Sequence, residues 1–271
     1  MERNLLLTIE YDGTDFFGWQ RQPNVKTVQG TLENALSTVC GREIKVEGTS
    51  RTDAGVHAYG QRATMKGNFG IPTDRVALAV NNRLSGGMRG KFATGPIRVR
   101  EVREMPLDFH ARFDAKGKTY IYKLDISGKP DVFRRNYYYE IGRSLDLWAM
   151  RQAARQIIGT HDFQCFQSTG GTQRETTVRT IYQLQIVERN GEVHIEVTGD
   201  GFLYNMVRII TGTLVEVGLG RRHPMELEAV IRGKDRQNAG HTAPPQGLYL
   251  AQIYYDLKEV PGYEGSTSGM G

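Results

Sequence analysis

The sequence predicts an α+β protein built from two similar ferredoxin-like or RRM-like halves, with antiparallel sheets joined around a central cleft. Its 271 residues exceed the usual size of one domain. The first hundred residues order as strand, helix, strand, strand, helix, strand, which is the split βαβ arrangement, and the second half repeats a similar order. We therefore predict an α+β domain over residues 1–105, a second over 106–258 and a disordered tail over 259–271.

The first domain is predicted from its apolar runs and helix caps. Residues 4–11 carry consecutive apolar side chains into a Tyr-Asp-Gly turn, as a buried strand does. A helix with apolar residues at helical spacing starts at Thr27 and is closed by Gly41. The other expected elements are strands over 43–49, 61–66 and 97–105 and a helix over 73–84.

The second domain follows an expected crossing over residues 106–117. The Asn190-Gly191 dipeptide predicts a hairpin turn between two strands, and residues 203–217 read as a strongly apolar helix. The other expected elements are helices over 145–158 and 224–233 and strands over 118–126, 177–189, 192–198 and 248–255.

Composition restricts the class of protein. Lys and Arg number 35 against 30 Asp and Glu, so the net charge is 35 − 30 = +5, which permits a polyanionic partner without proving one. Cys40 and Cys165 are too few for a disulfide framework and lack the paired spacing of a zinc site. No apolar run approaches the roughly 20 residues that span a bilayer. We expect a soluble, unexported protein of the reducing cytoplasm, with no membrane partner.

The stretch 50–58 sets the carboxylate of Asp53 between Arg51 and a glycine turn at Gly55. Aspartate is a common turn residue because its carboxylate accepts hydrogen bonds from backbone N–H groups nearby. Catalytic groups also lie in loops at strand ends. The residues alone favour the structural role of Asp53 over a chemical one.

Two further side chains are candidates for a site. Arg208 lies within the apolar 203–217 pattern, and because an uncompensated buried charge is costly, it implies a carboxylate partner. Asp53 is one candidate among about thirty acids. Tyr120, at the entry of a strand, is more often packing material than a functional group.

Other motifs favour structural roles. The aromatics of residues 16–19 favour a hydrophobic plug over a nucleic-acid stacking surface. Adjacent His161 and Asp162 side chains diverge, so a turn or helix stop is favoured over a metal site. Residues 239–248 form a Pro/Gly connector. Walker, dinucleotide and HExxH motifs are absent in the required context, and no cofactor is indicated.

Several blocks of the sequence resemble the tRNA pseudouridine synthase A (TruA) family, in the family's order. The most specific is Arg51-Thr52-Asp53-Ala54-Gly55-Val56-His57-Ala58. The others are residues 11–14 with 17–20, 27–29, 109–113, 116–120, 161–163, 202–208 and 239–244. The departures are Ser50, where glycine is commoner, and the glycine-rich 85–96, which is longer than usual and leaves the detail of RNA contacts open.

The resemblance implies that uridine is isomerised to pseudouridine at positions 38 to 40 of the tRNA anticodon stem-loop, by a homodimer without metal or cofactor. It makes Asp53 the nucleophile and Arg51 a group inserted at the displaced base. It makes Tyr120 the aromatic stacked on the uracil and Arg208 the salt-bridge partner of Asp53.

Two alternatives differ in class. A catalytically silent RNA-binding protein fits the charge and the aromatics but does not explain an Asp next to Arg51. A glycosidase-like enzyme with an Asp nucleophile needs a second carboxylate as acid, whereas the family pairs Asp53 with arginines.

Overall fold

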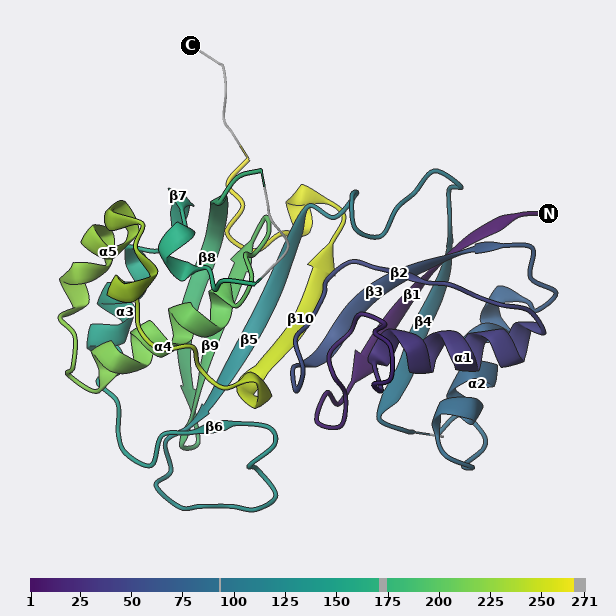
Figure 1. Ribbon diagram of the computed structural model, residues 1–271, viewed down its shortest axis with the longest axis horizontal. Coiled ribbons are helices and arrows are strands. Elements are labelled where there is room, and N and C mark those ends of the chain that lie inside the picture. The colour runs from purple at the N-terminus through teal and green to yellow at the C-terminus, as the bar shows by residue number, and fades with distance from the viewer. Residues whose placement is uncertain (93, 171–174, 266–271) are drawn as a thin grey trace, which may run out of the picture. The chain divides into compact units, whose positions relative to one another are not determined.

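The computed structural model describes residues 1–92, 94–170 and 175–265. In this described part, helices α1 to α5 and strands β1 to β10 are interspersed along the chain (Figure 1). The α+β class predicted from the sequence is confirmed.

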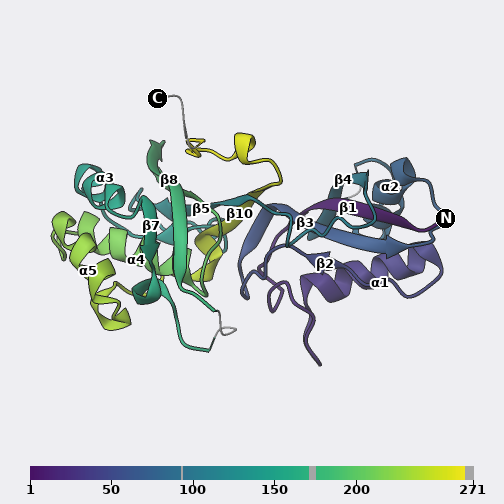
Figure 2. The same ribbon diagram turned by 90° about the horizontal axis from the view of Figure 1, so that it is seen from above.

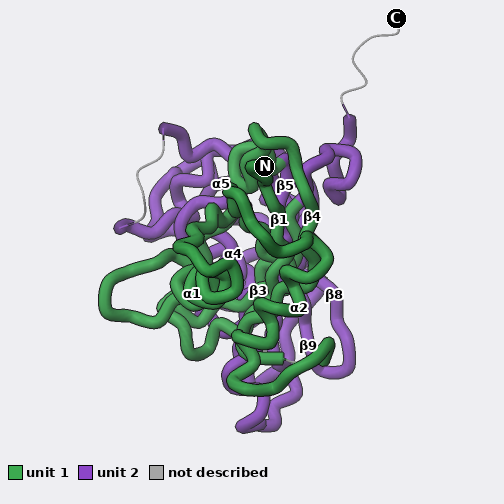
Figure 3. Tube along the Cα trace, turned by 90° about the vertical axis from the view of Figure 1, so that its right-hand side faces the viewer, with its two compact units in different colours: residues 1–115, 249–253 green, residues 116–248, 254–271 purple. Residues whose placement is uncertain are grey.

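The chain divides into two compact units, drawn in different colours in Figure 3. Unit 1 contains residues 1–115 and 249–253, and unit 2 contains residues 116–248 and 254–271. Unit 1 is therefore assembled from two separate segments of the chain.

The sheet of unit 1 is organised around its first strand. Leu5, Leu7 and Ile9 of this strand are fully buried, and its neighbours on both sides run antiparallel to it. The last strand lies parallel to the third, with Tyr249 opposite His57. The strands of unit 1 are β1 (Arg3–Tyr11), β2 (Glu47–Gly48), β3 (His57–Gly67), β4 (Ile97–Met105) and most of β10 (Leu248–Tyr254).

The two helices predicted in unit 1 are present as α1 (Val28–Cys40) and α2 (Thr73–Leu84). They pack against one another. The Thr27 hydroxyl accepts a hydrogen bond from the Gly30 N–H, which caps the start of α1. Gly41 ends the helix with φ +66°, in the left-handed region that favours glycine.

The strand predicted over 43–49 is wrong except at Glu47–Gly48. Side chains of α1 occupy the backbone N–H groups that would have joined a ladder. Ser37 Oγ accepts from Ile44 N at 2.9 Å, and Glu33 Oε1 accepts from Val46 N at 2.9 Å. The strand predicted over 61–66 begins earlier, because Ala58 already lies opposite Tyr11 of β1.

Unit 2 contains an antiparallel sheet with the strand order β5, β9, β8, β7, to which β6 adds parallel to β5. Asn190 and Gly191, at φ 51° and 82°, form the predicted hairpin turn between β8 and β9. The strands are β5 (Gly117–Asp125), β6 (Tyr139–Glu140), β7 (Gly159–Asp162), β8 (Val178–Arg189) and β9 (Glu192–Gly199).

Helices α3 (Leu147–Arg155), α4 (Met206–Gly218) and α5 (Leu227–Gly233) gather in unit 2 (Figure 2). Helix α4 is buried over almost its whole length and packs against both α3 and β5. It is the central core element of this unit. None of the helices in the described residues is long and apolar enough to cross a membrane.

Strand β7, Gly159–Asp162, stands where a turn or helix stop was predicted. His161 lies opposite Arg179 in the β7–β8 ladder, and the hydroxyls of Thr160 and Thr180 lie 2.8 Å apart. Asp162 forms an ion pair with Lys234 at 2.7 Å. These polar residues join the sheet because β8 supplies the partners.

The tail predicted from residue 259 is ordered in its first part. Val260 is 4% exposed, and the ring of Tyr263 packs edge-on against Tyr182 with centroids 5.6 Å apart. Residues 259–263 therefore belong to the folded unit 2, whereas residues 266–271 lie outside the described part of the chain.

Candidate active site

Asp53 lies in the loop between β2 and β3, at the start of a tight turn. Val56 N donates to Asp53 O at 3.2 Å, and Gly55 has φ +77°, as the third position of a type II turn requires. The Asp53 side chain is half-buried, and Arg51 is exposed. The backbone turn expected from the residues is present, and its carboxylate keeps access to solvent.

The loop after β1 holds this turn from one side. Trp19 N donates to Thr52 O at 3.0 Å, and Gly55 N donates to Phe16 O at 3.4 Å. Gly18 has φ +82°, and a Cβ there would lie 2.6 Å from Thr52 O. Glycine at position 18 is thus required by the close approach of the two loops.

A buried histidine supports the end of the turn. Gly13 N lies 3.0 Å from His57 Nδ1, Asp12 Oδ1 lies 3.2 Å from the same nitrogen, and the His57 side chain is 2% exposed. A Cβ on Gly13 would lie 2.1 Å from Val56 O, and the His57 ring stacks on Tyr249 with centroids 4.7 Å apart. Although His57 lies within the Arg51–Ala58 motif, nothing in the sequence pattern indicated this supporting role.

Gln61 fixes the other end of the loop. Its side chain donates to Ser50 O at 2.7 Å and accepts from Ser50 N at 3.2 Å, and it is fully buried. A side-chain amide therefore replaces a strand partner for Ser50. Sequence reasoning missed Gln61, because its amide acts on a residue 11 positions earlier.

The aromatics after β1 divide between two environments. Phe16 and Trp19 are 3% and 1% exposed and form the predicted plug under the loop. Phe17, between them, is 59% exposed. The prediction of a plug is confirmed for two of the three rings.

Tyr120 lies on β5 opposite Val197 of β9. Its ring packs edge-on against Phe202, with centroids 5.1 Å apart and planes at 85°, and the residue is 8% exposed. Tyr122, two residues on, points to the same face of the strand. Its hydroxyl donates to Pro244 O at 2.5 Å.

Arg208 lies in the first turn of α4, since the helix begins at Met206 and not at residue 203. Its Nε donates to Ala243 O at 2.8 Å and an Nη donates to Asn205 Oδ1 at 2.8 Å. In return, Ala243 N donates to Arg208 O at 3.1 Å. The guanidinium is thereby oriented by two neutral acceptors of unit 2.

Burial raises the pKa of Tyr122 well above its usual value, and the Arg208 charge partly opposes this rise. Tyr122 therefore stays a hydroxyl donor to Pro244. Because Arg208 and Tyr122 bind consecutive carbonyls, at Ala243 and Pro244, α4, β5 and this connector meet at one place in unit 2.

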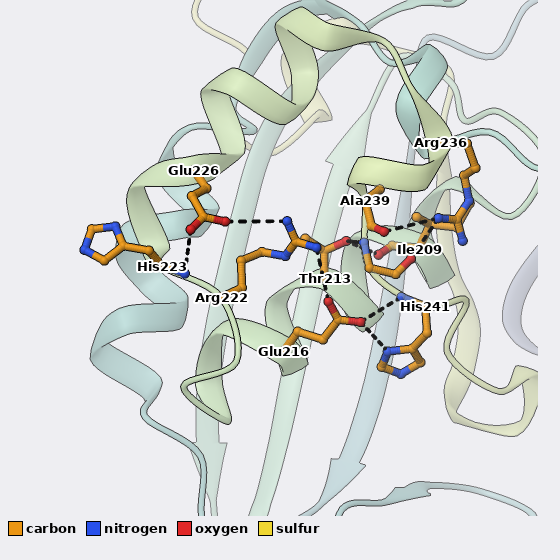
Figure 4. A network of polar contacts seen from close by, with 10 residues as sticks. Ile209, Thr213, Glu216, Arg222, His223, Glu226, Arg236, Ala239 and His241 are labelled. Carbon is orange, nitrogen blue, oxygen red and sulfur yellow. Dashed lines mark hydrogen bonds and ion pairs between the residues drawn. The ribbon is translucent and has the colours of Figure 1, made fainter.

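The connector 239–244 is fixed along α4 by a polar network (Figure 4). Gly240 N donates to Thr213 Oγ1 at 2.9 Å, and Glu216 Oε1 lies 2.9 Å from His241 N and 3.0 Å from His241 Nδ1. Arg222 approaches the other Glu216 oxygen at 3.4 Å. These hydrogen bonds hold the connector against α4, and Arg208 binds it at Ala243.

Unit 1 thus places Asp53 and Arg51 on one braced loop. Unit 2 places Tyr120 on β5 against Phe202, and Arg208 against the connector. Among the described residues, no cluster of three or more His, Cys, Asp or Glu side chains has an arrangement suited to a metal ion.

Known proteins resemble this chain over nearly its whole length. The profile of a family described as tRNA pseudouridine synthase matches residues 7–114 and 153–256. A relative from Clostridium tetani, named tRNA pseudouridine synthase A 2, is 44% identical over 258 residues, which cover 94% of this chain and 100% of the relative. A relative from Ruminiclostridium cellulolyticum, named tRNA pseudouridine synthase A, is 47% identical over 254 residues, covering 93% of this chain and 100% of the relative.

Among solved structures, a Cbf5-Nop10-Gar1 complex aligns with 78% of this chain and 45% of its own matched chain, at 11% identity and a TM-score of 0.35. The family profile includes both the Asp53 turn and Arg208, whereas Tyr120 lies between its two matched segments.

Proposed function

Because the chain belongs to the tRNA pseudouridine synthase A family, whose members are isomerases of uridine in tRNA, we propose that Asp53 is its nucleophile and that its targets are uridines 38 to 40 of the anticodon stem-loop. The observation that carries the proposal is the brace around Asp53. The loop after β1 and the Gln61 side chain fix the backbone on either side of this turn, while Asp53 stays half-buried. A preorganised carboxylate of this kind suits nucleophilic chemistry.

In the proposed reaction, the ionised Asp53 attacks uracil C6 or ribose C1′, or removes the ribose 2′ proton. The N1–C1′ bond breaks, the detached uracil rotates, and C5 bonds to C1′. The C5 proton is released to solvent and N1 takes up a proton, so atoms balance. Arg208 is the proposed salt-bridge partner of Asp53, because a guanidinium favours the ionised form of a neighbouring carboxylate. Its hydrogen bonds to Ala243 and Asn205 set its orientation in advance.

The target base must leave its stack, at a cost of a few kcal/mol. We assign to Arg51, which is exposed, insertion at the place of the displaced base. We assign to Tyr120 the stacking on the uracil, since an aromatic contact stabilises an unstacked base by about 1–3 kcal/mol. At 8% exposure, Tyr120 offers the uracil a restricted part of its ring.

The proposal includes tRNA as the partner, a homodimer as the working form and the cytoplasm as the place of reaction. No step assigned to these residues uses a metal or a cofactor. Light scattering of the purified protein measures the oligomeric state, and a mass of one chain, 30.5 kDa, at micromolar concentration would contradict the dimer.

The decisive variant is Asp53→Asn. We expect it to abolish tritium release from tRNA that contains 5-tritiated uridine, while tRNA binding persists. Asp108→Asn, at an exposed aspartate of the same unit, is the control and keeps the wild-type rate. Normal release by Asp53→Asn would sink the assignment of the nucleophile.

The target positions need a separate experiment. Anticodon stem-loops that carry a single uridine at position 38, 39 or 40, or at an upper position of the stem, are incubated with the protein and mapped for pseudouridine. Product at the upper control position, or at none of the three, contradicts the proposed site of modification.

A further inference from the structure

Phe17 is the aromatic side chain that the loop after β1 leaves at the surface. It is 59% exposed, although its neighbours Phe16 and Trp19 are 3% and 1% exposed. A single exposed apolar side chain is ordinary on a protein surface, so the setting of Phe17 has to show whether the ring has a function.

The position of Phe17 is fixed by its backbone. Phe17 N donates to Lys26 O at 2.9 Å, and Gln22 Nε2 donates to Phe17 O at 3.2 Å. Both main-chain polar groups of the residue are therefore bound. The ring is presented from a rigid loop, which lowers the entropy lost when a ligand binds to it.

The same loop touches the nucleophile's turn on both sides of Phe17. Phe16 O accepts from Gly55 N, and a Cβ on Gly18 would lie 3.1 Å from the carbonyl carbon of Asp53. Phe17 is thus one residue away from each of the two contacts that brace Asp53.

Exposed cations outnumber exposed acids on the loop after β1 and the Asp53 turn, although Arg21 is itself paired with Glu33 at 2.8 Å. Lys26, Arg21 and Arg51 are exposed, against the exposed acid Asp15. Lys26 Nζ lies 4.6 Å from the centroid of the buried Phe16 ring. A rigid aromatic among cations is the combination that single-stranded nucleic acid binds, by stacking and by phosphate contact.

We propose that Phe17 stacks on a tRNA base next to the target uridine. The inference rests on the proposed function, in which the target itself is displaced and stacks on Tyr120. Displacement uncovers one face of each of the two neighbouring bases. With Arg51 inserted against one of them, the exposed Phe17 ring, on the loop that braces Asp53, can cover the other. Phe17 then contributes to tRNA affinity and not to the chemical step.

Three variants at this position separate stacking from general apolar contact. Phe17→Ala raises the KM for tRNA about 5- to 150-fold, the range expected for one lost base stack, with kcat changed less than about threefold. Phe17→Tyr keeps the wild-type KM, and Phe17→Leu behaves like Phe17→Ala. Leu107→Ala is the control, because Leu107 is an apolar side chain that is 54% exposed in the same unit, close to the 59% of Phe17.

A fluorescent stem-loop locates the contact. 2-Aminopurine replaces, one at a time, the bases that flank the target uridine, in complexes with Asp53→Asn, which are expected to form without turnover. Fluorescence quenching at one flanking position, lost in Asp53→Asn/Phe17→Ala, supports stacking. Equal quenching with and without Phe17 at every position overturns it.

The outcomes distinguish the two proposals. If the wild-type protein forms no pseudouridine in any tRNA, the proposed function is wrong. If the wild type is active and Phe17→Ala keeps its KM, or if Phe17→Leu is as good as the wild type, only the stacking inference is wrong. A changed oligomeric mass with unchanged KM assigns the ring to a protein interface instead, and also overturns the inference.

Discussion

Arg208 Nε lies 2.8 Å from the carbonyl oxygen of Ala243, a residue 35 positions further along the chain. The contact joins the first turn of α4 to the end of the connector and fixes the direction of the guanidinium. The positive charge of Arg208 is therefore not enough to hold this arrangement, because two of its N–H donors must also point at fixed acceptors.

Arg208→Lys tests this dependence on geometry. A lysine keeps the charge but cannot bind Ala243 O and Asn205 Oδ1 with two divergent donors, so we expect a loss of about 1–3 kcal/mol in the free energy of unfolding and a fall in activity. Chemical denaturation and tritium release measure the two effects. The control is Arg232→Lys, at an exposed ion pair with Glu228. Equal stability of the two variants would contradict the prediction.

Gly18→Ala tests the contact between the loop after β1 and the Asp53 turn. Both Gly18 and Gly41 have positive φ, but a Cβ at position 41 meets nothing within 4 Å, whereas at position 18 it lies 2.6 Å from Thr52 O. Gly41→Ala therefore loses only about 1–2 kcal/mol of stability through backbone strain. Gly18→Ala loses more and displaces Asp53, so its kcat falls well below that of Gly41→Ala in parallel assays.

Ser50→Ala is expected to stabilise the protein, unlike the two preceding variants. Ser50 is 5% exposed, and its hydroxyl oxygen is buried without a hydrogen-bond partner. Removing an unsatisfied buried hydroxyl should raise the free energy of unfolding by about 1 kcal/mol. The contrast is Ser85→Ala, because the buried Ser85 hydroxyl donates to Met88 O at 2.5 Å. Urea titration should show stabilisation in the first variant and destabilisation in the second.

The Glu216 carboxylate makes part of the stability of unit 2 dependent on pH. Burial raises its pKa, but hydrogen bonds from His241 and the charge of Arg222 outweigh burial and lower the pKa below its ordinary value. A carboxylate whose pKa is lower in the folded protein than in the unfolded chain stabilises the fold. This stabilisation is fully present at pH values above the pKa in the unfolded chain, about 4.3, and is lost as the pH falls through the pKa in the folded protein.

Glu216→Gln isolates this contribution from the other carboxylates with lowered pKa, which both proteins share. We expect the difference in Tm between wild type and variant to be largest near pH 6 and to shrink as pH falls below about 4. Glu188→Gln, at an exposed position of β8, serves as the comparison. A difference that stays constant from pH 6 to pH 3 is the contrary result.

Local chemistry explains which elements could be predicted. The ends of α1 follow from Thr27 and Gly41, whose cap interactions involve only neighbouring residues. The strand over 43–49 failed because Glu33 and Ser37, on a helix, bind its N–H groups. Strand β7 was missed because its glycine and three polar residues pair only through β8.

Some features of the candidate site could likewise be predicted from the sequence, and others could not. The Asp53 turn could be predicted from Asp-Ala-Gly, and the roles of Asp53 and Arg51 come from family resemblance. The supports supplied by His57, Gln61 and Ala243 could not be predicted, because each acts on a residue distant in sequence. Sequence pattern indicates which side chains are candidates, and tertiary contacts decide how each is held.

Residues 249–253 of β10 complete unit 1, where Tyr249 pairs with His57 and a Cβ on Gly60 would lie 2.4 Å from Ala251 O. During synthesis, this edge of β3 therefore stays unpaired until β10, near the end of the polypeptide, has been translated. An excised fragment of residues 1–115 would expose that edge and be prone to aggregate. The segment that carries Asp53 is consequently not an independent module, and its final shape depends on the last strand to be translated.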